Sequence, residues 1–279
     1  MRRPLVLSII IPSHNEADHI DACLKSVLAS TGPKVAQVIV AANGCEDDTV
    51  LRAQMYEGIA GSRGWHIDVL DMPAVGKIGA LNQADHIAKF PMRLYLDADV
   101  TIDPDLLRQL CVVLDTKEPR YASGQMRLAP AQSWATRAYA RIYAQVPFVT
   151  DGVPGAGLFA VNTAGRHNWV LFPKIISDDT YVRLSFSPDQ RIAVDAGYDW
   201  PLVEGFPALV KVRRRQNAGV AEVAEKYPYL LENDDKHTLS FGEKLRMALS
   251  DPLGMLVYGA VAVIVKLTPQ KDGSWGRGR

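Results

Sequence analysis

The order of the apolar segments constrains the fold of this chain more than any other feature of its sequence. Residues 5–11 form a continuous apolar run, and residues 16–30 then carry apolar side chains at helical spacing. A short apolar run predicts a strand that is covered on both faces, whereas spacings of three and four residues predict a helix. The same alternation recurs at residues 35–41, 47–56, 67–70, 78–90, 92–96 and 105–114. The sequence therefore predicts an α/β fold, with a mostly parallel sheet flanked by helices.

The alternation becomes less regular after residue 118. Six further elements are predicted there. They are strands at 121–128, 191–194 and 210–212, a Gly-rich turn into a strand at 153–161, and helices at 133–144 and 178–184. Because no linker is visible, we interpret residues 1–220 as one globular domain with halves at about 1–118 and 119–220. Residues 271–279, which are Gly-rich and basic, are expected to be disordered.

Residues 221–270 are predicted to form a helical extension. Residues 241–250 are amphipathic and include Lys244 and Arg246, and residues 253–265 carry no charge. A bilayer-spanning helix needs about 20 apolar residues, so this shorter segment predicts either a core helix or an interfacial one. Basic residues beside apolar stretches are typical of interfacial anchors, which raises the hypothesis of peripheral membrane contact.

Charge and cysteine content exclude some classes of protein. Among 279 residues, Lys and Arg together number 31 and Asp and Glu together number 31, so the formal net charge is zero. A general nucleic-acid binder usually carries a basic excess, so no nucleic-acid partner is expected. The cysteines Cys23, Cys45 and Cys111 form no metal-binding pair. They suit a reducing compartment, so we expect a cytoplasmic protein.

Two carboxylates follow the strand predicted at residues 92–96. Asp97 and Asp99 are two residues apart, and both can reach one hard cation if the chain curls there. Mg²⁺ or Mn²⁺ held by one or two carboxylates together with phosphate oxygens is the usual arrangement for nucleoside diphosphates. An Asp-rich turn that caps the next helix is the alternative interpretation.

Polar loops also follow the first two predicted strands. In a parallel sheet, ligands bind at the carboxyl ends of the strands, where these loops lie. Both loops can contact a base and ribose, or they can simply cap the helices that follow. The candidate residues are Pro12, Asn15 and Glu16 in the first loop and Asn43, Gly44 and Asp47 in the second.

Three further polar clusters are candidates for chemistry. A Gly-rich turn enters a helix at residue 76, an acidic pair begins the helix at 178–184, and three arginines are consecutive. A lysine at a helix start can meet a diphosphate, a carboxylate beside a second carboxylate can act as a general base, and arginines can stabilise a leaving group. Helix capping and a solvated basic face are the alternatives. The residues are Lys77 and Asn82, then Asp178 and Asp179, then Arg213, Arg214 and Arg215.

Taken in order, these motifs resemble the family 2 glycosyltransferases with the GT-A, Rossmann-like fold. The stretches that carry the resemblance are SIIIPSHNEADHIDACLKSVL (8–28), VIVAANGCEDDT (38–49), GKIGALNQA (76–84), YLDADV (95–100), GAGLFAVN (155–162) and SDDTYVRL (177–184). The resemblance implies metal-dependent, inverting transfer from a nucleoside-diphosphate sugar, with Mg²⁺ or Mn²⁺ as cofactor. It implies that residues 1–118 bind the donor and residues 119–220 the acceptor.

The resemblance also assigns roles. Pro12, Asn15, Glu16, Asn43, Gly44, Asp47, Lys77, Asn82 and Asp97 are expected to contact the donor, with Arg213, Arg214 and Arg215 near its diphosphate. Asp99 is expected to bind the metal, assisted by Asp97. Asp179 is expected to be the catalytic base, with Asp178 beside it.

The partners that follow are a nucleotide-sugar and a glycan or lipid-linked acceptor, in cell-surface polysaccharide or glycolipid synthesis. If the extension touches a membrane, its inner face is the expected location. A catalytically silent scaffold of the same fold and a nucleotidylyltransferase are the alternatives. The second would need a Gly-rich, basic loop after the first strand, where residues 12–20 read PSHNEADHI.

Overall fold

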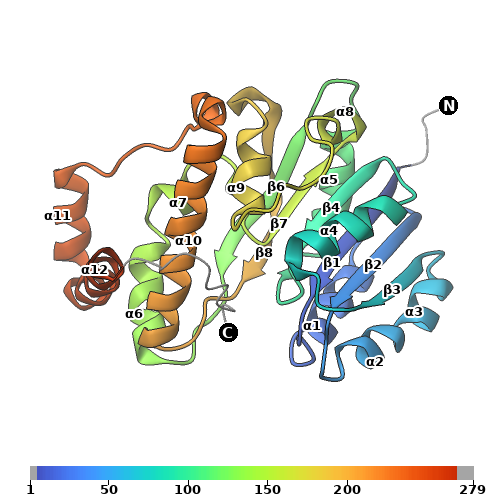
Figure 1. Ribbon diagram of the computed structural model, residues 1–279, viewed down its shortest axis with the longest axis horizontal. Coiled ribbons are helices and arrows are strands. Elements are labelled where there is room, and N and C mark those ends of the chain that lie inside the picture. Colours follow the sequence, from blue (N-terminus) through green and yellow to red (C-terminus); the bar gives the residue numbers. More distant parts are fainter. Residues whose placement is uncertain (1–4, 269–279) are drawn as a thin grey trace.

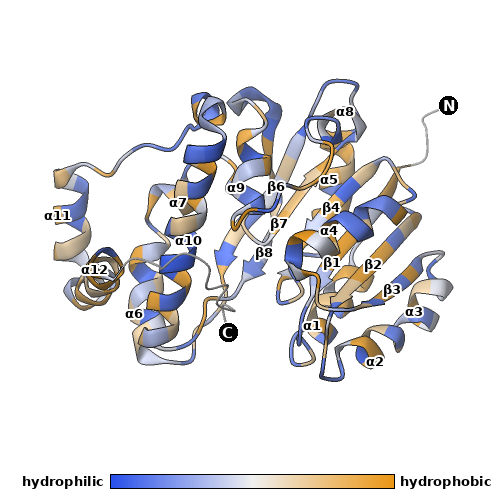
Figure 2. Ribbon diagram, in the orientation of Figure 1, coloured by the Kyte–Doolittle hydropathy of each residue, from blue (hydrophilic) through white to orange (hydrophobic). Residues whose placement is uncertain are grey.

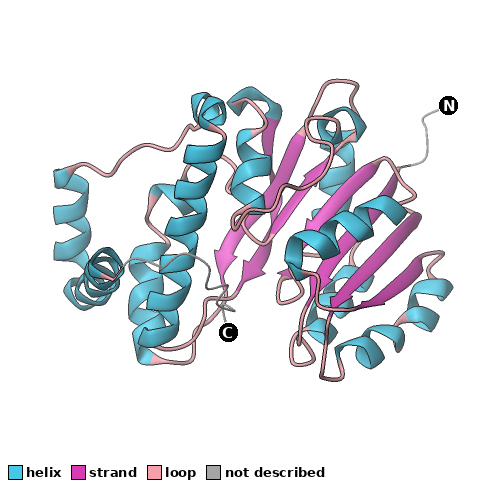
Figure 3. Cartoon of the chain, in the orientation of Figure 1, coloured by secondary structure: helices cyan, strands magenta, loops and turns pink. Residues whose placement is uncertain are grey.

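The computed structural model describes residues 5–268, which form one eight-stranded sheet covered by helices (Figure 1). The strand order in the sheet is β3-β2-β1-β4-β7-β6-β8-β5. The strands are β1 (Val6–Ser13), β2 (Val35–Asn43), β3 (His66–Met72), β4 (Met92–Leu96), β5 (Thr101–Ile102), β6 (Tyr121–Leu128), β7 (Leu158–Val161) and β8 (Arg191–Trp200). The predicted α/β class with a mostly parallel sheet is confirmed, and Figure 3 shows the helices on both sides of it.

The first half of the sheet is parallel. β1 lies between β2 and β4, and all three run in the same direction as β3. The connecting helices are α1 (Ile20–Ala29), α2 (Thr49–Gln54), α3 (Glu57–Ser62), α4 (Gly76–Ile87) and α5 (Leu106–Leu114). This order is the predicted strand–helix alternation, except that the helix expected at 47–56 ends at Gln54 and a second short helix follows.

The second half mixes strand directions. β7 is antiparallel to both β4 and β6, whereas β6 and β8 are parallel. The remaining helices are α6 (Trp134–Tyr143), α7 (Pro147–Thr150), α8 (Thr163–Arg166), α9 (Asp178–Leu184), α10 (Phe206–Lys226), α11 (Phe241–Ser250) and α12 (Pro252–Leu267). Short 3₁₀ turns lie at Pro188–Gln190 and Pro228–Asn233.

Alternate residues of the strands feed two separate cores. Ile9 packs in a cluster with Leu24 of α1 and Leu107 of α5, whereas the next residue, Ile10, packs with Leu81 of α4 on the opposite face. This division follows from the two-residue period of a strand. Figure 2 shows the hydrophobic colour along the strands of the sheet. This is expected because helices cover both faces of the sheet.

A third apolar cluster joins α6, α10 and α12 beside the sheet. The strand predicted at residues 210–212 is wrong, because these residues lie inside α10. Pro207 begins this helix, and Leu209 and Val210 are buried against its neighbours, so packing overrides the β preference of the valines. α10 also runs through residue 220, where we expected the domain to end.

The helical extension predicted after residue 220 is present as the end of α10 together with α11 and α12. No helix within residues 5–268 is both long and apolar enough to cross a bilayer. The tail predicted to be disordered, residues 271–279, lies outside the described residues.

A buried ion cluster joins the two halves of the sheet. Asp85 of α4 accepts hydrogen bonds from Tyr95 Oη at 2.6 Å and from Arg166 Nε at 2.9 Å, and it also pairs with Arg93. Burial opposes the charged form, but the hydrogen bonds from Arg166 and Tyr95 and the positive charges of Arg166 and Arg93 lower the pKa of Asp85. The charge of Asp85 therefore stabilises the folded chain.

Replacing Asp85 by Asn is expected to lower the free energy of unfolding by about 3 kcal/mol, because two mostly buried arginines would lose their carboxylate. Since the pKa of Asp85 is lowered on folding, its contribution is present at neutral pH and is lost as the pH falls through the folded-state pKa. Urea denaturation at several pH values should show the difference between wild type and Asp85→Asn shrinking in acid. Asp199→Asn, which breaks the exposed pair with Arg127, is the matched control and should cost about 1 kcal/mol or less.

Candidate active site

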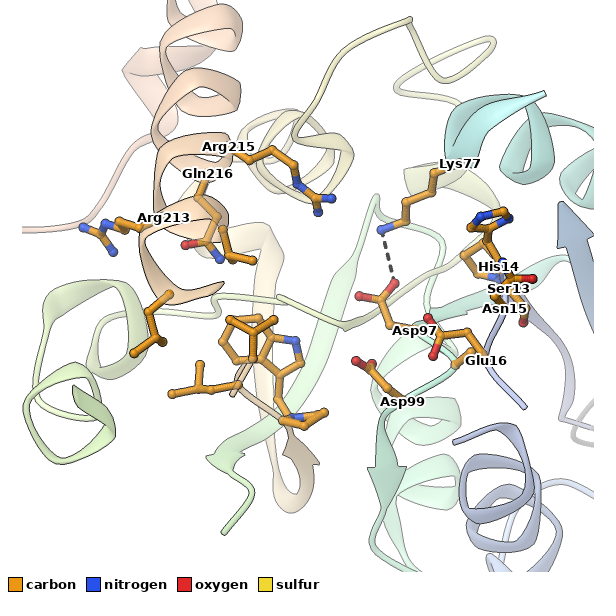
Figure 4. A pocket seen from close by; sticks show the side chains of 18 of the residues that line it. Ser13, His14, Asn15, Glu16, Lys77, Asp97, Asp99, Arg213, Arg215 and Gln216 are labelled. Atoms are coloured by element: carbon orange, nitrogen blue, oxygen red, sulfur yellow. Dashed lines mark ion pairs between the residues drawn. The ribbon is translucent and has the colours of Figure 1, made fainter. Parts of the chain in front are cut away.

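A cavity of about 460 Å³ opens at the carboxyl ends of β1, β2 and β4. The loop after β1, the loop after β4 and the start of α4 form one wall, while α6, α10 and the segment after β8 form the other. The cavity therefore lies between the two halves predicted from the sequence. Figure 4 shows the acidic residues of the first wall facing α10 across it.

Lys77 is held between carboxylates from two elements. Its ammonium lies 3.1 Å from Asp97, after β4 (Figure 4). It also lies 3.3 Å from Asp178, at the start of α9. Burial works against the charged form, but the charges of Asp178, Asp97 and Asp179 raise the pKa of Lys77. This lysine therefore stays protonated and ties α4 and α9 to the end of β4.

The acidic pair at the start of α9 divides into two environments. Asp178 is buried, and burial together with the nearby carboxylates of Asp179 and Asp97 raises its pKa, although Lys77 opposes this. Asp179 is half-buried and, with Asp97 and Lys77, lines a small cavity of about 20 Å³ next to the main one. Its carboxylate accepts the backbone N–H of Thr180 at 2.7 Å. Of the two carboxylates, Asp179 is therefore the more accessible.

The backbone before α4 is fixed by Asn43, which lies at the end of β2. Its Oδ1 accepts the N–H groups of Val75 and Gly76 at 2.7 and 3.0 Å. Asn43 also lines the cavity, and the turn that it holds leads directly into Lys77. The sequence predicted a ligand contact for Asn43, and the structure adds this positioning role.

The loop after β1 adopts an unusual conformation. Asn15 has a φ of 54°, in the left-handed region that Asn tolerates better than most residues, and its Oδ1 accepts the N–H of Glu46 at 2.8 Å. Pro12, Asn15 and Glu16 all line the cavity, together with their neighbour His14. The first predicted loop is thus brought to the site and is joined to the second.

His14 was not predicted as a site residue. Its Nδ1 lies 2.6 Å from the carbonyl oxygen of Asn43, which assigns the proton to Nδ1 and leaves Nε2 as an acceptor. Nε2 is buried and has no hydrogen-bond partner among residues 5–268. His14 as a residue lines the cavity, but this nitrogen is not itself exposed to it. The sequence signal was only its place within the first loop.

Gly44 and Asp47 do not line the cavity and support the loops instead. Gly44 has a φ of 59°, and a Cβ there would lie 2.7 Å from that of Ala74, so no larger residue fits. Asp47 accepts hydrogen bonds from Ala17 N at 3.0 Å and from Thr49 N at 3.1 Å. The expected contacts of these two residues with the donor are therefore replaced by roles within the scaffold.

Asn82 also points away from the cavity. Its Nδ2 donates to the carbonyl oxygen of Phe172 at 3.1 Å, and its Oδ1 accepts the N–H of the same residue at 2.8 Å. Both the oxygen and the nitrogen of the Asn82 amide are thus hydrogen-bonded to the backbone of Phe172. Asn82 therefore holds the segment before α9 against α4 and lines neither cavity, and its contact with the nucleotide stays a prediction.

The three consecutive arginines point in different directions, because successive residues of a helix are about 100° apart. Arg215 points across the cavity toward Lys77 (Figure 4). Arg213 also lines the cavity, and its guanidinium lies 5.9 Å from the ring centroid of Tyr143. Arg214 donates to Thr268 Oγ1 at 2.6 Å and does not line the cavity. Two of the three arginines therefore line the cavity, and Arg215 is the one that points toward Lys77.

The wall opposite the carboxylates is apolar and aromatic, and no motif predicted it. Trp200, at the end of β8, packs on Gly157, where a Cβ would lie 2.6 Å from the indole ring. Tyr143 of α6 and Leu209 and Val212 of α10 continue this wall. These residues are spread over three elements, and only the packing of the second half brings them together.

The residues present fit a divalent cation that is shared with a phosphate ligand. Asp97 and Asp99 both line the cavity and offer the oxygen atoms that Mg²⁺ and Mn²⁺ prefer. No group of three or more potential metal-binding side chains is found within residues 5–268. A cation at this place would therefore take its remaining oxygen atoms from the ligand and from water.

Replacing Asn82 by Ala is expected to destabilise the fold by about 1–3 kcal/mol, because two backbone groups of Phe172 lose their partners. Nucleotide affinity of the folded variant should stay unchanged. Asn43→Ala is the contrasting variant, since it releases the turn before Lys77 and should weaken nucleotide binding. Calorimetric titration with UDP and GDP would measure the nucleotide affinity of both variants. A loss of affinity in Asn82→Ala would support the nucleotide contact that the sequence predicted for Asn82.

Comparisons with known proteins identify the fold and the family of the chain. No curated protein matches the chain. The mannosyltransferase PcManGT from Pyrobaculum calidifontis, solved with GDP-Man and Mn²⁺, has a TM-score of 0.58 and 16% identity, covering 97% of this chain and 77% of its own. S. aureus TarS 1–349 with UDP-GlcNAc has a TM-score of 0.54 and 15% identity, covering 98% and 95%.

A third similar structure is the glucosyl-3-phosphoglycerate synthase from Mycobacterium tuberculosis with Mn²⁺, UDP and glucosyl-3-phosphoglycerate. Its TM-score is 0.54 at 16% identity, covering 79% of each chain. The present chain covers 42% of a longer TarS chain. At these identities the structures establish a shared GT-A fold. The sequence profile of glycosyl transferase family 2 matches residues 8–166, more than half of the chain. The chain therefore belongs to glycosyl transferase family 2, a family of sugar-transferring enzymes.

Proposed function

We propose that this enzyme transfers a sugar from a nucleoside-diphosphate sugar to a hydroxyl group, with inversion and with help from Mg²⁺ or Mn²⁺. The observation that carries the proposal is that Asp97 and Asp99 line the main cavity with Lys77, opposite Arg215, while Asp97, Lys77 and Asp179 also line the small cavity next to it. This arrangement offers separate groups for a metal, a leaving diphosphate and a proton acceptor.

The charges of the site support binding of a cation together with a diphosphate. The lining contains Asp97, Asp99, Asp178, Asp179 and Glu16 against Lys77, Arg213 and Arg215, so the side chains of the site carry excess negative charge. A divalent cation on Asp99 and Asp97 would offset that charge and neutralise the diphosphate as it departs. Lys77 and Arg215, on opposite walls, would then hold the phosphate oxygens from two sides.

Asp179 is the proposed catalytic base. Its carboxylate accepts the proton of the acceptor hydroxyl while the hydroxyl oxygen bonds to the anomeric carbon and the diphosphate leaves with the bonding electron pair. The half-buried position of Asp179 beside Asp97 suits this role. Asp178, by contrast, is buried and paired with Lys77, so it serves to hold that lysine.

The acceptor would enter beside Trp200, Tyr143 and Val212. An aromatic and apolar wall suits the apolar face of a sugar ring or the start of a lipid chain, so the proposed acceptor is a glycan or a lipid-linked glycan. The loop after β1, which includes His14, would meet the nucleotide base. Similar proteins were solved with UDP-GlcNAc and with GDP-Man, so both UDP and GDP donors are candidates. A cytoplasmic location is part of the proposal and fits three free cysteines.

Asp179→Asn is expected to lower kcat by roughly 10²–10⁴, the usual loss when a general base is removed. Donor affinity, measured by calorimetry, should change little, because Asp179 faces the acceptor. Asp178→Asn is the contrasting variant: it frees Lys77 and should weaken donor binding as well. Hydrolysis of a nucleotide-sugar serves as the readout, because it needs no known acceptor. If Asp179→Asn turns over the nucleotide-sugar as fast as wild type, Asp179 is not the base.

Mn²⁺ should increase the affinity of the wild-type protein for UDP or GDP, and EDTA should abolish the increase. Asp99→Ala is expected to lose this metal dependence, since a carboxylate on the cation is gone. Asp103→Ala is the matched control, because Asp103 follows in the same loop but pairs with Arg127 at 2.7 Å. Equal affinity with and without Mn²⁺ in the wild type would contradict the metal assignment.

A further inference from the structure

α11 carries an exposed apolar stripe. Phe241, Leu245 and Leu249 are 81%, 48% and 74% exposed. At about 100° per residue these three positions fall on one side of the helix. Met247, which is 6% exposed, lies on the opposite side and fixes the helix to the body. Three large apolar residues therefore point to solvent as a continuous row.

Basic residues border this stripe on both sides. Lys244 and Arg246 are exposed, and at about 100° per residue they fall on either side of the row. Neither forms an ion pair with any residue in the range 5–268. The acidic residues nearby are engaged elsewhere, since Glu243 accepts from Ser240 N at 2.8 Å and Asp251 pairs with Arg141 at 2.6 Å. The outward charge of the stripe is therefore positive.

α12 extends the exposed apolar surface. Leu253, Leu256 and Leu267 are 53%, 69% and 76% exposed and share one helical face, while Val261 on another face is 1% exposed. Lys266, near the end of α12, is exposed and adds a further positive charge. Figure 2 shows α12 largely in the hydrophobic colour, and Figure 1 places α11 and α12 together at one end of the molecule.

These two helices are firmly attached to the wall of the active site. Tyr258 of α12 lies 5.2 Å, between ring centroids, from Tyr139 of α6, and Asp251 accepts two hydrogen bonds from Arg141 of α6. Tyr139 itself lines the cavity. A partner or surface that binds the outer faces of α11 and α12 is therefore held at a fixed position relative to the acceptor side of the site.

We propose that this surface docks the protein on a bilayer with anionic headgroups. We call it the C-terminal apolar face, and it comprises Phe241, Leu245, Leu249, Leu253, Leu256 and Leu267. An apolar stripe bordered by cations suits the boundary between acyl chains and negative headgroups, where apolar side chains enter and Lys and Arg stay at the charged layer. A second copy of the chain would bring like charges together, so the charge pattern favours the bilayer.

The inference does not rest on the proposed reaction, because it concerns a surface outside the cavity. Vesicle binding can be measured without donor, acceptor or metal. A protein that binds vesicles and transfers no sugar would contradict only the proposed function. A protein that hydrolyses a nucleotide-sugar and ignores vesicles would contradict only the inference.

The test is flotation of the full chain with vesicles of phosphatidylcholine and of phosphatidylcholine mixed with phosphatidylglycerol. We expect binding to the mixed vesicles, weaker binding at high salt, and little binding to phosphatidylcholine alone. The double variant Leu245→Glu, Leu249→Glu should lose at least about tenfold in partitioning, since two acids replace apolar groups that would enter the bilayer. Lys244→Gln with Arg246→Gln should lose the preference for anionic vesicles while keeping the fold.

Matched controls come from outside the C-terminal apolar face. Leu51 of α2 and Met55, directly after α2, are 63% and 77% exposed, so Leu51→Glu with Met55→Glu changes equivalent surface and should leave flotation unchanged. Lys211→Gln on α10 controls for the loss of a positive charge. Thermal unfolding verifies that each variant is folded. The inference is overturned if the wild-type protein does not float with the mixed vesicles. It is also overturned if the variant Leu245→Glu, Leu249→Glu floats as well as the variant Leu51→Glu, Met55→Glu. A dimer seen by light scattering that Leu245→Glu, Leu249→Glu dissociates would overturn it too.

Discussion

The ion pairs of Lys77 with Asp97 and Asp178 are the contacts on which the site depends. They join three segments that are far apart in sequence: the loop after β4, the start of α4 and the start of α9. Four carboxylates in one region would repel each other without a cation among them. Lys77 supplies that cation, and Asn43 fixes the turn that presents it. In the proposed reaction, the same lysine would turn from the carboxylates to the phosphate oxygens of the donor.

The cavity has two unlike walls because two halves of the sheet are built differently. The parallel half ends in polar loops, which is where such sheets bind nucleotides. The other half contributes α6 and α10, whose inner faces are aromatic and apolar. The charged steps of the reaction and the recognition of the acceptor are thus separated in space. α12 covers the outer side of the acceptor wall and connects it to the surface that we infer to meet a bilayer.

Prediction from sequence succeeded where local pattern and packing agree. The apolar runs of β1, β2 and β4 can be buried only as strands in the middle of a sheet, and Asp97 and Asp99 follow directly from the end of such a strand. It failed where packing decides. The valines near residue 210 favour a strand by themselves, yet they lie in α10 because α6 and α12 pack against that helix. Asn82 and Asp47 belong to motifs of the family, but their side chains are used up by backbone partners.

The sequence by itself determined the α/β order, the family and the acidic residues of the site, because each of these depends on short segments whose residues are close in the chain. Only the tertiary structure decided which members of a motif face the ligand. Helix geometry sends Arg213, Arg214 and Arg215 in three different directions, so that Arg213 and Arg215 line the cavity whereas Arg214 bonds to Thr268 outside it. The tertiary structure also revealed the acceptor wall and the exposed stripe of α11, since burial and exposure depend on neighbours that are remote in sequence.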